Sequence, residues 1–226
     1  MKVYYFKTLA VLFLISAFFT ACDPEEEIPV DNYRCICTMN TGKSMVSFSL
    51  NTRGENANTA SIDWGDGQKE SLTFYTTDGK TITHSYKTDK QPPHIITVSG
   101  PIDFINCEGN QLTSLNITGP VVDLLCRDNQ LTSLDLNRLQ LLERLYCNGN
   151  QLTGLDVNMN TELQYLDIRY NLMDAESLNN LFSMLPNRSS IYTGSGSIYI
   201  TGNPGADTCD RNIAYSQGWS VDNSMK

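Results

Sequence analysis

Residues 124–136 read Leu124-Leu-Cys-Arg-Asp-Asn-Gln-Leu-Thr-Ser-Leu-Asp-Leu136, and closely related stretches precede and follow them. The chain repeats this pattern from Ile105 to Ile117 and from Leu145 to Val157, and a shortened fourth copy runs from Leu166 to Met173. One asparagine recurs at intervals of 19, 21 and 21 residues, at Asn110, Asn129, Asn150 and Asn171. A regular period of about 20 residues indicates a repeat architecture.

A single repeat of this length is too short to bury its own apolar residues, so neighbouring repeats are expected to share a core. The alternate residues of each Leu-x-Cys segment would point inward from a short strand, and the strands of successive repeats would pair in parallel about 4.8 Å apart. The recurring asparagine falls where the chain turns, and its amide can satisfy backbone groups that the turn leaves unpaired.

Leucines and asparagines at these spacings resemble the leucine-rich-repeat family. Cys107, Cys126 and Cys147, at the third strand position, resemble the cysteine ladder of internalin-type repeats, and residues 129–136 are similar to the repeats of bacteroidete surface lipoproteins. The resemblance implies a mixed α/β solenoid, in which a short leucine-rich-repeat stack with parallel β-strands occupies residues 102–173.

Different segments flank the repeats. Residues 44–101 alternate apolar and polar residues in short runs, which predicts strands. Within them, Trp64-Gly-Asp-Gly67 followed by His84-Ser-Tyr86 resembles the immunoglobulin-like β-sandwich of polycystic-kidney-disease-type (PKD) domains, so we expect a small antiparallel β segment that serves as an N-terminal cap. Downstream, Asp174 can cap a helix that stops before Pro186, which predicts a helical C-terminal cap over residues 174–226.

The first 21 residues have the layout of a secretory signal peptide. Lys2 and Lys7 precede an apolar run that is too short to span a membrane comfortably, and small residues precede Cys22. Phe19-Thr-Ala-Cys22 resembles a bacterial lipobox, which implies cleavage before Cys22 and lipidation of that cysteine. An uncleaved membrane anchor is the alternative.

Residues 22–43 are then expected to be a lipidated cysteine and an acidic tether. Asp23-Pro-Glu-Glu-Glu27 combines proline with like charges, which keep a segment extended and solvated. An acidic run directly after the cysteine resembles the surface-export signal of bacteroidete lipoproteins. It implies an outer-membrane lipoprotein exposed at the cell surface, and the alternative is an anchor that faces the periplasm. No further apolar stretch of about 18 residues follows, so the lipid is the expected membrane contact.

Charge and motifs narrow the function. The formal charge of −9 disfavours nucleic acid as a partner, because acidic proteins repel phosphate backbones. No nucleophile motif such as Gly-x-Ser-x-Gly is present, so we do not expect an enzyme, although a hydrolase is an alternative. His84 is expected to pack in the sandwich. Asp63, Asp66 and Glu70 could gather around calcium, but a tight turn explains the same residues more simply.

The cysteines are expected to be structural. A stacked column points its thiols in parallel, whereas zinc ligands converge on one point and disulfide partners face each other. We therefore expect Cys107, Cys126 and Cys147 to be buried as small apolar side chains, with no metal and no cofactor. Cys35 or Cys37 could pair with Cys209, although connectivity cannot be deduced from sequence.

The outward positions of the repeat strands are the candidate binding site. They form three columns and comprise Phe104, Asp123, Arg144 and Tyr165; Asn106, Leu125, Tyr146 and Asp167; and Glu108, Arg127, Asn148 and Arg169. Aromatic residues and arginines are typical of binding hot spots, although a plain solvated surface is the alternative. We expect a non-catalytic protein that binds a protein or glycan partner here. The competing hypothesis is a structural or accessory subunit of an outer-membrane complex.

Overall fold

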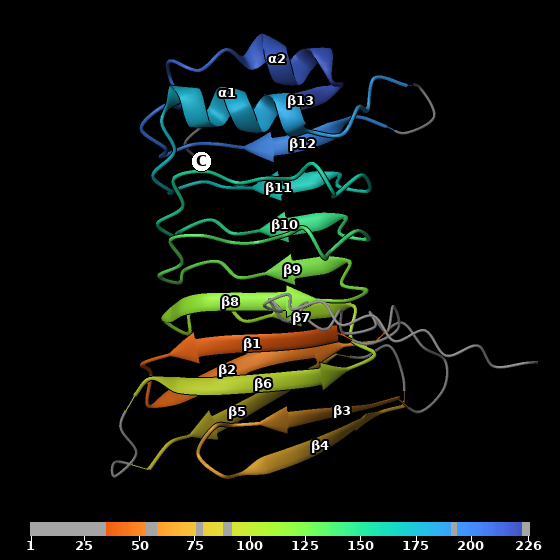
Figure 1. Ribbon diagram of the computed structural model, residues 1–226. Coiled ribbons are helices and arrows are strands. Elements are labelled where there is room, and N and C mark those ends of the chain that lie inside the picture. The colour runs from red at the N-terminus through yellow and green to blue at the C-terminus, as the bar shows by residue number, and fades with distance from the viewer. Residues whose placement is uncertain (1–34, 53–57, 76–78, 88–91, 191–193, 223–226) are drawn as a thin grey trace, which may run out of the picture. The chain divides into compact units, whose positions relative to one another are not determined.

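Figure 1 shows the computed structural model, which describes residues 35–52, 58–75, 79–87, 92–190 and 194–222. All of these described residues belong to one compact unit. The signal peptide, Cys22 and the acidic run that follows it lie outside the described residues. Within the described ranges, no helix combines the length and the apolar character that a membrane crossing requires.

One sheet has five strands, all paired antiparallel. In order across the sheet the strands are β4 (Lys69–Phe74), β3 (Asn58–Asp63), β6 (His94–Gly100), β1 (Cys35–Thr41) and β8 (Leu112–Thr118). Every second residue of β1 is buried, as expected for a sheet with one face on the core. Strand β8 belongs to the first sequence repeat, so that repeat contributes directly to this antiparallel sheet.

The other sheet has eight strands and is mixed. In order they are β13 (Trp219–Asp222), β12 (Gly196–Tyr199), β11 (Tyr165–Asp167), β10 (Arg144–Tyr146), β9 (Asp123–Leu125), β7 (Phe104–Asn106), β2 (Met45–Asn51) and β5 (Lys80–Ser85). Pairing is parallel from β13 to β7 and antiparallel from β7 through β2 to β5. Figure 1 shows β9, β10, β11 and β12 following one another in chain order.

The predicted fold class, a mixed α/β solenoid with a separate PKD-like segment and a helical cap, is wrong. Of the described residues, 38% lie in strands and 9% in helices, and the strands form one antiparallel and one mixed sheet. Residues 44–101 do not make a sheet of their own, because β2 and β5 join the mixed sheet while β3, β4 and β6 join the other. The physical reason is the free edge of β7, whose backbone groups need partners and obtain them from β2.

Buried asparagines link neighbouring turns of the repeats. Asn129 Oδ1 accepts hydrogen bonds from the backbone nitrogens of Asn110 and Leu112, both at 3.0 Å. Its amide nitrogen donates to the backbone oxygens of Cys107 and Cys126 at 3.1 and 3.0 Å. The other repeat asparagines bond similarly. This role matches the one expected from the sequence, and it explains why a short polar side chain recurs inside the core.

A fifth asparagine continues the same series at a point that the sequence repeat does not mark. Asn203 Oδ1 accepts from the Met173 nitrogen at 3.1 Å, and its amide nitrogen donates to the oxygens of Ile168 and Ile200. Between Asn171 and Asn203 the chain forms helix α1 (Ala175–Met184), which interrupts the period.

Two helices lie in the described part of the C-terminal region, α1 and α2 (Arg211–Ser216). The Asp174 carboxylate caps α1 by accepting from the Ser177 nitrogen at 2.8 Å. The helix buries Leu178, Leu181 and Phe182 against the common core, and strands β12 and β13 extend the mixed sheet beside it.

Candidate functional site

The outward side of the mixed sheet carries the candidate site. In each three-residue strand the middle residue is fully buried and its neighbours face away from the core, because side chains alternate along a strand. The middle residues are Ile105, Leu124, Leu145 and Leu166. We call the opposite side of all eight strands the outward face.

A single in-register row crosses the outward face from one sheet edge to the other. Its members are Thr81, Ser49, Asn106, Leu125, Tyr146, Asp167, Tyr199 and Asp222. Eight strands span about 34 Å at the usual strand spacing, so the face is about twice as wide as the four predicted strands alone.

Three half-buried tyrosines, Tyr146, Tyr165 and Tyr199, lie ring beside ring on this face with their planes tilted by 31° and 37°, and we call them the tyrosine row. The ring centroids of Tyr146 and Tyr165 lie 4.6 Å apart, and those of Tyr165 and Tyr199 lie 5.2 Å apart. Burial raises the pKa of Tyr165 to about 12, and the charge of Asp167 adds to this effect. The Tyr165 hydroxyl is therefore protonated at neutral pH and is able both to donate and to accept hydrogen bonds.

Arg169 borders the tyrosine row. Its Nη2 lies 2.6 Å from Asp167 Oδ2 and its Nε lies 2.9 Å from Asp167 Oδ1, which is a two-point pairing. The guanidinium carbon also lies 5.4 Å from the centroid of the Tyr199 ring. The hydrogen bond to Asp167 raises the pKa of Arg169 above its usual range. The arginine is thus held in one place while part of its side chain remains exposed.

Two further ion pairs connect neighbouring strands on the same face. Arg144 of β10 bonds Asp123 of β9, and Arg127 bonds Glu108 one turn earlier, each with an N–O distance of 2.5 Å. Both arginine side chains are more than a third exposed, so solvent weakens each pair, and each contributes at most about 1 kcal/mol to folding. Their main effect is to hold the guanidinium groups in place on the face.

The structure places all twelve predicted residues on or directly after β7, β9, β10 and β11. Most of them belong to the in-register row, to the tyrosine row or to one of the ion pairs. Asn148 is different, because its buried Oδ1 has no hydrogen-bond partner among the described residues. Sequence reasoning missed Tyr199 of β12 and the hydroxyl residues Ser49 and Thr81 of β2 and β5. A signal for Tyr199 was present, because Ser197-Ile-Tyr-Ile200 alternates like the repeat strands.

A pocket of about 270 Å³ opens at the antiparallel end of the outward face. It is lined by Ser47, Phe48, Ser49, Thr81, Asn106 and Glu108, and we call it the hydroxyl pocket. It lies on β2, β5 and β7, at the other end of the row from Tyr199.

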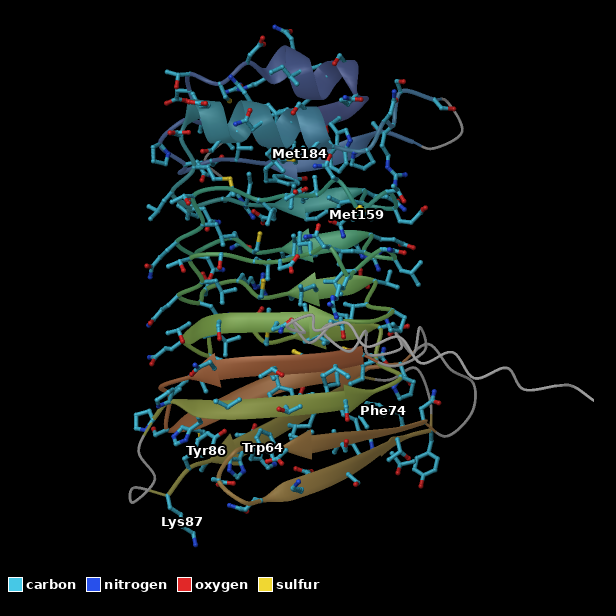
Figure 2. All side chains as sticks on the ribbon, viewed as in Figure 1. Trp64, Phe74, Tyr86, Lys87, Met159 and Met184 are labelled. Carbon is cyan, nitrogen blue, oxygen red and sulfur yellow. The ribbon has the colours of Figure 1, made fainter. Side chains whose placement is uncertain are left out.

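His84 packs in the sheet region, as the sequence predicted. Its ring stacks on Trp64 with centroids 4.3 Å apart, and its Nε2 lies 2.9 Å from Asp66 Oδ2. Figure 2 shows Trp64 close to Tyr86, whose hydroxyl donates to the Trp64 backbone oxygen at 2.9 Å. Asp63 instead pairs with Lys69, so the acidic residues of this turn bond other groups, and the calcium alternative finds no gathered ligands among the described residues.

The six described cysteines are free thiols. Burial raises the pKa of Cys37 of β1 well above its ordinary value, and the nearby Cys35 and Cys107 thiols add to this effect, so a buried thiol from outside the repeats lies near the column. Burial raises the pKa of Cys107 to about 12 and that of Cys126 well above its ordinary value, which keeps these thiols protonated and unreactive. The pairing suggested between Cys35 or Cys37 and Cys209 does not form.

Comparisons with known proteins add little. No family model matches the chain, and no curated protein does. Among solved structures, the chain is similar to the functional domain of InlJ from Listeria monocytogenes, which includes a cysteine ladder. The two are 17% identical, with a TM-score of 0.32, and the match covers 55% of this chain and 41% of that one. The chain thus spans less than half of that domain, and a likeness this low assigns neither fold nor function.

Proposed function

We propose that this protein is a non-catalytic binding protein that holds a protein partner on the tyrosine row of its outward face. The observation that carries this proposal is the set of contacting tyrosine rings, Tyr146, Tyr165 and Tyr199, beside the paired arginines Arg144 and Arg169. Tyrosine and arginine dominate the binding energy of protein interfaces when they lie together at the centre of a patch.

Preorganisation supports the proposal. The tyrosine rings contact one another, and Arg169 is bonded to Asp167 and placed over Tyr199. Side chains that are already held in one rotamer lose little freedom when a partner binds, so more of the contact energy remains as affinity.

The charge of the face points to a protein rather than a polyanion. Arg127, Arg144 and Arg169 each pair with an acidic residue. A site for phosphate groups would need arginines that are free to neutralise them. The paired charges also predict that partner affinity depends only weakly on salt concentration.

A photo-crosslinking amino acid at position 165 tests the proposal in producing cells. We expect a discrete crosslinked partner from position 165 and none from position 75, because Tyr75 is an exposed tyrosine at the end of β4, outside the row. Equal products from both positions, or none from position 165, would contradict a specific partner on this face.

Affinity measurements on the purified partner complete the test. Tyr165→Ala is expected to weaken binding by at least about tenfold, which corresponds to more than about 1.4 kcal/mol, while the matched change Tyr75→Ala has no effect. An integral outer-membrane protein as the crosslinked partner would favour the accessory-subunit hypothesis over a soluble ligand.

The proposed location is the cell surface, through a lipid on Cys22. It is supported by the apolar run that ends at Phe19-Thr-Ala-Cys22 and by the acidic residues that follow. Protease treatment of intact producing cells tests it against a known periplasmic control. Loss of the full-length chain with the control intact is the expected result, and protection of the chain would point to the periplasmic side instead.

A further inference from the structure

The hydroxyl pocket is chemically unlike the rest of the outward face. Three of its lining residues are hydroxyl side chains, Ser47 and Ser49 from β2 and Thr81 from β5. Strand β7 supplies Asn106, and Glu108 follows that strand. None of the tyrosines of the tyrosine row contributes to it.

The hydroxyl groups at this pocket bond one another in pairs, and each pair keeps donor and acceptor positions that are not used. Ser49 Oγ lies 2.8 Å from Thr81 Oγ1, and Thr83 Oγ1 donates to Ser47 Oγ at 3.2 Å. A hydroxyl has one donor and two acceptor positions, so each of these contacts uses only part of what the two groups offer. A ligand in the pocket therefore meets both donors and acceptors.

Asn106 and Glu108 add an amide and a carboxylate. Asn106 Oδ1 accepts from the Glu108 nitrogen at 3.1 Å, and among the described residues the Asn106 amide nitrogen has no partner. Glu108 bonds Arg127 through Oε2, and its Oε1 has no hydrogen-bond partner in the described part of the chain. Neighbouring donors and acceptors of this kind match vicinal hydroxyl groups, which donate and accept in turn.

Charge and size narrow the ligand further. Among the described residues that line the pocket Glu108 alone is charged, and it is already paired with Arg127, so the lining supplies no cationic group of its own to bind an acidic ligand. A volume of about 270 Å³ is small for a drug-sized ligand but large enough for a single ring with several hydroxyl groups.

We propose that the hydroxyl pocket binds one neutral sugar residue of a glycan. In this arrangement Glu108 and Asn106 bond adjacent sugar hydroxyls, while Ser49 and Thr81 bond a third. The site goes beyond the proposed protein-binding function, because it lies on β2, β5 and β7 rather than on the tyrosine row. A ligand of about 12 non-hydrogen atoms with ordinary ligand efficiency binds with a dissociation constant in roughly the millimolar range.

The test is a titration of the full chain, followed by NMR, with methyl glycosides of glucose, galactose, mannose, fucose and N-acetylglucosamine up to roughly 50 mM, a ceiling chosen for a millimolar site. At least one neutral glycoside is expected to bind, and the matching glucuronide more weakly. Thr81→Val should weaken binding at least about fivefold, because it replaces a hydroxyl group with a methyl group of similar size. Glu108→Gln should have an effect of similar size, because it replaces a charged carboxylate acceptor with a neutral amide of nearly the same volume.

Controls separate this site from the tyrosine row and from misfolding. Ser220 lies on β13 at the far end of the sheet, so Ser220→Ala should leave sugar binding unchanged. Tyr165→Ala should also leave sugar binding unchanged, but it should weaken binding of the protein partner. Unchanged melting temperatures show that the pocket variants are folded. The proposal is overturned if none of the glycosides binds, or if the variants bind as the wild type does. Stronger binding of butylamine than of every glycoside would overturn it as well, and would identify the pocket as a receptor for a lysine side chain.

Discussion

Strands β9, β10 and β11 belong to the same sheet as β2 and β5, yet different interactions hold the two regions. Each of the first three has only three residues, and buried amides such as that of Asn129 connect one turn to the next. In contrast, β2 and β5 pair antiparallel over six backbone positions. The parallel region thus concentrates its stability in single polar side chains, whereas the antiparallel region spreads it over a backbone ladder.

The comparison has a functional side as well. The parallel strands carry the tyrosine row, and the antiparallel strands carry the hydroxyl pocket. One surface therefore offers aromatic and guanidinium groups at one end and hydroxyl groups at the other.

The largest expected effect comes from Asn129→Ala. The change leaves buried nitrogens of Asn110 and Leu112 and buried oxygens of Cys107 and Cys126 without their partner. We expect a loss of about 3–6 kcal/mol in the free energy of unfolding, measured in urea. The control is Asn40→Ala on β1, which should cost less than about 1 kcal/mol because the side-chain oxygen of Asn40 has no hydrogen-bond partner among the described residues. Similar losses for both would show that the linking amide of Asn129 carries no special share of the stability.

A smaller effect is expected from the thiol column. Cys126 is fully buried, so Cys126→Ser places a hydroxyl group in an apolar position and should lower stability by about 1–3 kcal/mol. The same change at the half-buried Cys209 should cost less than about 0.5 kcal/mol. Equal effects in thermal or urea unfolding would show that the column is not apolar in its energetics.

A third prediction concerns pH and the antiparallel region. Although burial opposes it, hydrogen bonds from the Gln68 nitrogen and the His84 ring hold the pKa of Asp66 below its usual range. A carboxylate whose pKa is lower in the folded state stabilises the protein above its unfolded pKa of about 4, and this contribution is lost as the pH falls through the folded value. Asp66→Asn should therefore flatten the decline in melting temperature between about pH 5 and pH 2.

The control for this prediction is Asp135→Asn, which changes an exposed aspartate of the repeats. In the described part of the chain its carboxylate bonds just one group, the backbone nitrogen of Asn137 in its own turn. This change should leave the acid profile close to that of the wild type. If both variants keep the wild-type slope, the bond between Asp66 and His84 does not contribute to acid sensitivity.

The smallest stability effect is expected at the proposed binding site. Arg144→Ala removes a partly exposed ion pair with Asp123 and should change the free energy of unfolding by less than about 1 kcal/mol. The same variant should weaken partner binding, because the guanidinium lies beside the tyrosine row. A large stability loss in urea unfolding would mean that Arg144 serves the fold rather than the partner.

Much of the local structure could be predicted from residue pattern. The buried leucines, the linking asparagines and the outward row of Tyr146 and Tyr165 all follow from a period of about 20 residues and from the alternation of side chains along a strand. The helix that follows Asp174 has a local cause too, because the capping carboxylate and the apolar spacing lie within one short segment.

Long-range pairing could not be predicted in this way. Nothing near β7 in the sequence indicates that β2, more than fifty residues earlier, completes its backbone hydrogen bonds. The same applies to Cys37, a buried thiol of β1 that lies near the repeat cysteine Cys107, and to Asn203, which continues the asparagine series after a helix. These partners are chosen by which edges and cavities remain open after local folding.

The repeat sequence is therefore sufficient to predict whether each repeat residue faces the core or the solvent, because the direction of a side chain depends on its position among its neighbours along the chain. The division of the strands into two sheets, the width of the outward face and the hydroxyl pocket depend on segments that meet only after folding. The reason is that backbone hydrogen bonds between strands carry almost no side-chain signature, so a sequence records which residues face the core more clearly than which strands pair.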